Sequence, residues 1–241
     1  MDGLAGCPGM TFGGLEKILT KNGHSVILVD VEGIQTHDDR IKKVLSCYEH
    51  VRTNFPGEKI FLLGQSAGGS AVRIAAESLE GLNQPDGVIL MSPAMPRFIW
   101  YGTPVLMKIM MKRLWQIICG KTLNSTDAEA RKLLSPMSKD VCDAALFARE
   151  PIPGKEAREL AFYPRPFKGV TCPVLLVYGD KDQWIAPSAQ KKLHKMLLKK
   201  ASCVTEFVAH GAGHVTLFSE SHKDVSLCIA KWINLQCCSK S

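Results

Sequence analysis

The pentapeptide Gly64-Gln65-Ser66-Ala67-Gly68 constrains the fold of this chain more than any other feature. It has the form G-x-S-x-G, and its flanks give that form a mechanical meaning. Residues 59–63 are a short apolar run typical of a buried strand, and residues 70–79 have the pattern of a helix. A strand, a sharp glycine turn and a helix lift the serine hydroxyl clear of a sheet. The pattern therefore predicts that Ser66 is a nucleophile, against the alternative of an incidental glycine-rich turn.

A serine hydroxyl is a poor nucleophile, so it needs a base and a group that orients the base. Two later apolar runs, each a predicted strand, are followed by suitable side chains: residues 172–178 precede Asp180 and Asp182, and residues 203–208 precede His210 and His214. Because the carboxyl ends of parallel strands meet at one edge of a sheet, we expect an acid and a histidine to lie near the serine.

This order of serine, aspartate and histidine, each just past a strand, resembles that of the α/β-hydrolases. The chain is similar to their serine hydrolases of the lysophospholipase and monoacylglycerol lipase type from Gly3 to about Leu235. The resemblance implies an α/β-hydrolase fold, with a mostly parallel sheet flanked by helices. Residues 1–95 and 168–241 would form the core, and residues 96–167 a helical cap. It also implies hydrolysis of a carboxylic ester with no metal and no organic cofactor.

The same resemblance selects between the candidate acids and bases. The family acid stands three residues after a strand-end glycine, which implies Asp182 after Gly179 and leaves Asp180 as a turn residue. The family histidine follows a small residue and precedes an apolar stretch, which implies His214 and leaves His210 as a surface residue.

The oxyanion hole implied by the resemblance consists of two backbone N–H groups. One belongs to Ala67, directly after the nucleophile, and the other to Leu4. Here the chain departs from its relatives, because Asp2-Gly3 stands in place of their His-Gly pair.

The resemblance next implies a helix over residues 12–22 and a strand over residues 25–30. The first three strands of the family have no counterpart in the sequence, and the third normally lies between the strands at 25–30 and 59–63. Three explanations remain open: a shortened form of the protein, a sheet that closes directly, or a partner strand that fills the slot. A non-catalytic binding relative and an incompletely folded fragment are accordingly alternatives to an enzyme.

Residues 96–167 interrupt the strand–helix rhythm after a predicted strand at 87–91. Met95, just past that strand, resembles the edge of the family's substrate pocket, and residues 105–119 form a broadly apolar helix with Met107, Met110, Met111 and Trp115. Methionines suit an adaptable lipophilic groove, which favours a monoacyl substrate; the alternative is a cap helix packed on its own core. Three basic side chains in this helix suit peripheral association with a membrane through the cap, namely Lys108, Lys112 and Arg113.

Composition narrows the possible binding partners and the cellular compartment of the chain. The formal net charge is +7, but the basic residues are spread and no aromatic residues interleave with them, so we expect no nucleic-acid partner. The lysines at 191–192 and 199–200 are interpreted as a solvated helix face with weak attraction to anionic lipid. Nine cysteines without metal-site spacing indicate reduced thiols and a cytoplasmic chain. Cys237 and Cys238 are either a palmitoylation site or an ordinary tail.

Overall fold

The computed structural model describes residues 14–29, 34, 36–79, 81–94, 167–182, 185–214, 216–218 and 222–238. Helices and strands alternate along most of this part of the chain. In chain order the elements are α2 (Leu15–Lys21), α3 (His37–Asn54), β1 (Phe61–Gln65), α4 (Ala67–Ser78), η1 (Gly81–Asn83), β2 (Gly87–Met91), β3 (Val174–Gly179), α9 (Pro187–Leu197), β4 (Val204–Ala209), η3 (Thr216–Phe218) and α10 (His222–Cys238).

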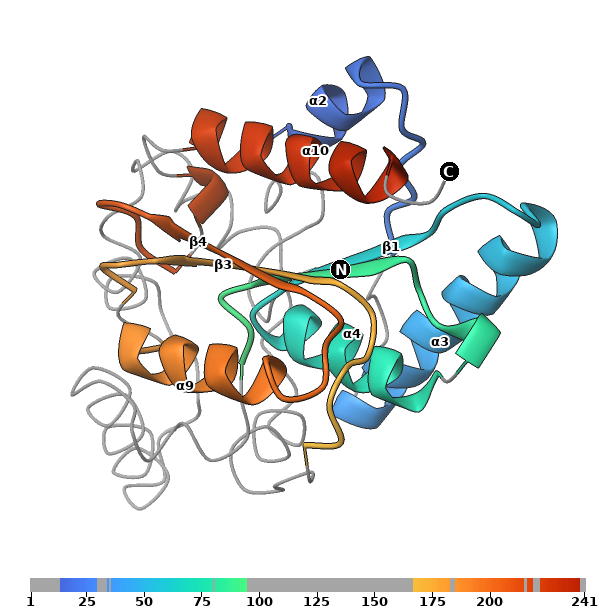
Figure 1. Ribbon diagram of the computed structural model, residues 1–241, viewed down its shortest axis with the longest axis horizontal. Helices are drawn as coiled ribbons and strands as arrows, with labels where there is room; N and C mark the ends of the chain where they lie inside the picture. The colour runs from blue at the N-terminus through green and yellow to red at the C-terminus, as the bar shows by residue number, and fades with distance from the viewer. Residues whose placement is uncertain are drawn as a thin grey trace, which may run out of the picture.

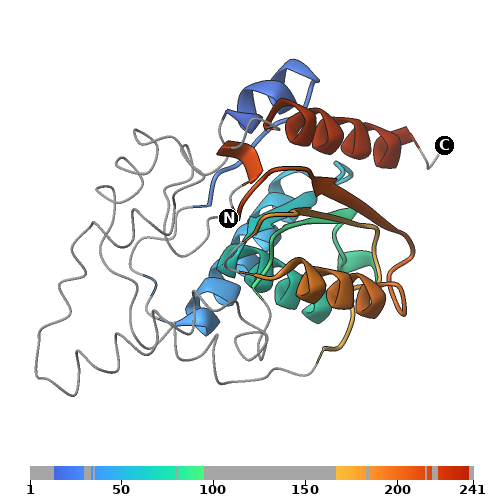
Figure 2. The ribbon, with the colours of Figure 1, turned by 90° about the vertical axis from the view of Figure 1, so that its left-hand side faces the viewer.

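The four strands form one parallel sheet in the order β1-β2-β3-β4. Phe61 pairs with Gly87, Val88 with Val174, and Val174 with Val204. Helices α3, α4 and α9 cover one face of the sheet, and α2 and α10 cover the other (Figures 1 and 2). The expectation of an α/β fold with a parallel sheet flanked by helices is confirmed.

Alternate strand residues feed two separate cores. Val88, Leu90 and Leu176 pack with α3, α4 and α9, whereas Ile89 and Leu175 pack with α2 and α10. Successive side chains of a strand point to opposite faces of the sheet, so a strand covered on both faces needs apolar residues throughout. All residues of β2 and β3 are buried accordingly.

Most of the elements expected from the sequence are present with shifted ends. The strand at 87–91 has the predicted bounds, while β1, β3 and β4 begin one or two residues later than expected. The helix after Ser66 begins at Ala67 instead of residue 70. Two long helices, α3 and α10, were not predicted. The first of them begins at a capping box, in which Thr36 and Asp39 bond each other's backbone N–H groups.

The expected strand at residues 25–30 is wrong for the part that the structure describes. Residues 24–29 are extended but belong to no sheet, and Ile27 and Leu28 are 56% and 48% exposed. The physical reason is the lack of a neighbour, because an extended chain becomes a strand only when another strand bonds to its backbone.

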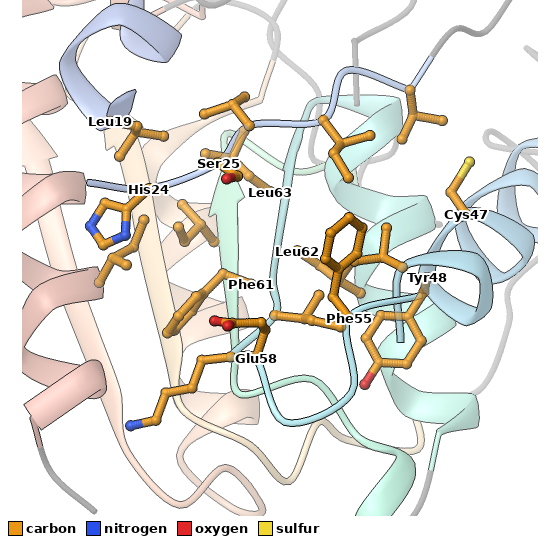
Figure 3. A pocket seen from close by; sticks show the side chains of 18 of the residues that line it. Leu19, His24, Ser25, Cys47, Tyr48, Phe55, Glu58, Phe61, Leu62 and Leu63 are labelled. Carbon is orange, nitrogen blue, oxygen red and sulfur yellow. The ribbon is translucent and has the colours of Figure 1, made fainter. Parts of the chain in front are cut away.

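The sheet also does not close directly across this gap. A cavity of about 880 Å³ is lined both by residues 23–29 and by residues 57–63 (Figure 3). The two segments are not paired with each other in the described part of the chain, so the explanation that the sheet closes directly is wrong. The proposed cap, residues 96–167, lies outside the described residues except for Phe167.

Among the described helices, none is long and apolar enough to cross a membrane.

Two cysteines that flank neighbouring strands should differ sharply in reactivity. Cys172, just before β3, is 3% exposed, and burial raises the pKa of its thiol to about 12; Cys203, just before β4, is exposed. The thiolate is the reactive form, so iodoacetamide at about pH 8 should alkylate Cys203 at least about ten times faster than Cys172. Mass spectrometry of the peptides gives both rates, and equal rates in the folded chain would contradict this packing.

Candidate active site

Ser66 occupies a strained turn between β1 and α4. Its φ of 52° and ψ of −120° place it in a region that residues other than glycine rarely adopt. The turn is tied to the end of β2, because the N–H of Ser66 donates to the carbonyl of Met91 at 2.9 Å and the N–H of Ala94 donates to the carbonyl of Ser66 at 2.8 Å. This is the geometry that the G-x-S-x-G pattern predicted for a nucleophile.

Glycines make the turn possible because strand and helix touch through their backbones. A Cβ on Gly64 would lie 2.5 Å from the carbonyl oxygen of Gly68, and one on Gly69 would lie 2.9 Å from the carbonyl oxygen of Gly64. No side chain fits at such distances. Gly64 and Gly69 therefore set how closely α4 approaches β1.

Asp182 and His214, from loops after β3 and β4, are hydrogen-bonded to each other. Nδ1 of His214 lies 2.9 Å from Oδ2 of Asp182, and the other carboxylate oxygen accepts the N–H of Ile185 at 2.9 Å. The Asp182 side chain is fully buried, and that of His214 is 14% exposed. Since the carboxylate accepts from Nδ1–H, the imidazole is held in the tautomer whose Nε2 carries the lone pair.

Gln65 links the histidine loop to the nucleophile turn. Its side-chain amide donates to the carbonyl of His214 at 3.2 Å, and the side chain is 1% exposed. Because Gln65 directly precedes Ser66, this bond brings the His214 backbone to the residue next to the nucleophile. The sequence analysis missed this role, since any residue is allowed at that position of the pattern and only its partner far along the chain reveals it.

Asp180 and His210 form a second, exposed pair. Asp180 accepts Nδ1–H of His210 at 3.1 Å and the N–H of Gly211 at 2.7 Å, and the hydrogen bond from His210 with that from Gly211 lowers the pKa of the Asp180 carboxyl. The His210 side chain is 86% exposed. The structure thus places Asp180 in the turn after β3, as expected of a turn residue, and His210 on the surface.

The backbone at the start of α4 offers one donor for an oxyanion. Ala67 is the first residue of α4 and is fully buried, and N–H groups in the first turn of a helix have no partner within the helix. The other expected donor, Leu4, lies outside the described residues, as do the expected pocket residues Met95, Met107, Met110, Met111 and Trp115. Within the described ranges, no three His, Cys, Asp or Glu side chains gather as metal ligands would.

Comparison with known proteins agrees with this geometry. The family described as serine aminopeptidase, S33, matches residues 12–222. The chain belongs to this family of α/β-hydrolases. No curated protein matched the sequence.

Solved structures resemble this α/β-hydrolase over almost its whole length. The monoacylglycerol lipase of Paleococcus ferrophilus is 24% identical, with a TM-score of 0.58 over 98% of this chain and 93% of its own. A thermophilic esterase from Thermogutta terrifontis is 18% identical, with a TM-score of 0.66 over 98% and 88%. The proline iminopeptidase of Mycobacterium smegmatis is 15% identical, with a TM-score of 0.64 over the same shares. At identities this low, the structural similarity establishes the fold of this α/β-hydrolase and nothing beyond it.

The contact between Gly64 and Gly68 gives a direct test of the turn. Gly64→Ala should lower the free energy of unfolding by at least about 1–3 kcal/mol, because its Cβ would meet backbone that cannot move aside. Ser70→Ala, in the first turn of α4, is the matched control. The buried Ser70 hydroxyl has no hydrogen-bond partner, so its loss should change the free energy of unfolding by less than about 0.5 kcal/mol. Urea melts measure both. A neutral Gly64→Ala would show that strand and helix are not in contact.

Proposed function

We propose that this α/β-hydrolase is a serine hydrolase that cleaves carboxylic esters through an acyl-enzyme. The observation that carries the proposal is the hydrogen bond between His214 and the fully buried Asp182, beyond the carboxyl ends of β4 and β3 in the parallel sheet whose β1 leads into Ser66. A buried carboxylate that fixes the tautomer of a histidine near a strained serine turn is the arrangement that activates a hydroxyl.

The mechanism assigns one role to each group. Nε2 of His214 takes the proton of the Ser66 hydroxyl while Oγ attacks the acyl carbonyl, and Asp182 stabilises the imidazolium that forms. The oxyanion of the tetrahedral intermediate accepts the N–H of Ala67 and that of Leu4, each donor contributing about 2.7–4 kcal/mol. The protonated His214 then gives its proton to the leaving alcohol. Water releases the acyl group by the same steps, and the chemistry requires no metal or organic cofactor.

The proposed substrate is a lipophilic monoacyl ester. The methionines and the tryptophan of residues 105–119 support it, because flexible apolar side chains suit an acyl chain. The similarity to a monoacylglycerol lipase and to an esterase adds analogy at the level of the fold. The basic residues of the same segment would hold the cap at a membrane surface, where such substrates reside.

A binding module without catalysis is the second candidate. The open cavity beside β1 favours it, because an incomplete sheet holds the Ser66 turn less firmly than a complete one. Such a protein would keep the fold and its pocket but would not activate Ser66.

Reaction with a fluorophosphonate probe separates the two candidates. We expect the purified chain to be labelled at Ser66, because the probe reacts with serines activated by a base. Ser66→Ala should lose the labelling and monoacylglycerol hydrolysis while its thermal midpoint changes little. A chain that melts cooperatively and takes no label would favour the binding module.

The two aspartates give a matched comparison of roles. Asp182→Asn should lower kcat/KM by about 10⁴-fold, since an amide favours the wrong tautomer of His214. Asp180→Asn, which weakens only an exposed pair, should lower it by less than about threefold. Steady-state kinetics on a soluble monoacyl ester measure both, and equal losses would refute the assignment of Asp182.

A further inference from the structure

Residues 25–29 are an extended segment whose backbone has no partner. Within the described part of the chain, none of the N–H and C=O groups from Ser25 to Val29 makes a hydrogen bond. Backbone groups of an extended chain at regular spacing are what a neighbouring strand bonds to. The segment therefore presents backbone groups to which a neighbouring strand could bond.

The space beside this segment is a slot in the sheet layer. The cavity of about 880 Å³ separates residues 25–29 from β1, the outermost strand of the described sheet. Leu15, Leu19 and Ile233 line it from the α2 and α10 layer, and Val44 and Tyr48 line it from α3. Phe61 and Leu62 project to opposite sides of β1 beside it (Figure 3). The cavity therefore lies within the sheet layer, between two helix layers, where a further strand would lie.

Both borders of the slot have the composition of interior strands. Val26-Ile27-Leu28-Val29 and Phe61-Leu62-Leu63 are uninterrupted apolar runs, as in parallel strands covered on both faces. Yet Phe61 to Leu63 are only partly buried and Ile27 is 56% exposed, whereas β2 and β3 are buried throughout. Filling the slot would bury these side chains.

Glu16 adds a charge to the slot. It lines the cavity from α2, and its Oε2 is buried without a hydrogen-bond partner. A buried carboxylate oxygen is costly until a donor reaches it. An occupant with a Lys or Arg side chain would supply that donor.

We propose that the slot binds a short extended segment of a separate polypeptide, apolar in its middle and basic at its end. The segment pairs with the backbone of residues 25–29, its apolar side chains fill the cavity, and its basic side chain meets Glu16. This is recognition by addition of a strand to a sheet. An acyl chain would fill the space but has no groups to bond the backbone. The proposal is independent of the proposed hydrolysis.

The test uses a designed peptide, Lys-Lys-Val-Ile-Val-Ile-Val-Lys-Lys, blocked at both ends. Titration should give saturable binding to the purified chain, and hydrogen exchange should slow at the amides of residues 25–29 and not at those of α9. The control is the same peptide N-methylated at alternate central residues, which keeps the apolar surface but removes hydrogen bonds. It should bind at least about ten times more weakly, since it cannot donate the hydrogen bonds of the methylated amides.

Two glutamate variants test the charge. Glu16→Gln should weaken binding of the lysine peptide by about tenfold, because a hydrogen bond to a charged group is lost. Glu49→Gln removes an exposed carboxylate that does not line the cavity and should leave the affinity unchanged. Circular dichroism melts confirm that both variants are folded.

Four results would overturn the proposal. The N-methylated peptide could bind as tightly as the unmodified one, or a chain that melts cooperatively could bind no peptide. Oleate, and not the peptide, could protect the amides of residues 25–29 from exchange. Finally, these amides could be protected in a dimer of the chain alone. None of these readouts depends on hydrolysis, so failure of the enzymatic proposal would be seen separately.

Discussion

The backbone contact between Gly64 and Gly68 is the constraint on which the candidate site depends. Because α4 begins so close to the end of β1, the residue between them must reverse direction at once, and Ser66 takes a positive φ to do so. The bonds from this turn to Met91 and Ala94 then fix it against the end of β2. Strain at one residue is sustained by packing and hydrogen bonds around it.

The parallel ladder brings distant parts of the chain to that turn. With strand order β1-β2-β3-β4, all four parallel strands end at the same edge of the sheet, so the loops that carry Asp182 and His214 lie at the same edge as the Ser66 turn. Gln65 then fastens the histidine loop to the turn. On this side of β1, the strands β2, β3 and β4 are paired with one another along their length.

The other side of β1 borders the open slot, so one strand belongs to both features. Its last residue, Gln65, holds the histidine loop, and its first residues, Phe61 and Leu62, line the cavity. A strand added in the slot would bury the apolar side chains of β1. The proposed occupant would thereby stiffen the support of the Ser66 turn, which links the two proposals physically without making either depend on the other.

Local pattern was enough for the features whose cause is local. The glycines around Ser66 predicted the turn, and the apolar runs predicted β2 to within its bounds and β1, β3 and β4 to within two residues, because a buried parallel strand must be apolar throughout. Tertiary structure decided the rest. The run at residues 25–29 has the composition of a strand but no bonded neighbour among the described residues. The family resemblance implied Asp182 and His214, but their contact is a hydrogen bond between residues from two different loops, which only the tertiary structure makes. Sequence determines which segments can pair, whereas pairing itself requires a partner within hydrogen-bonding distance.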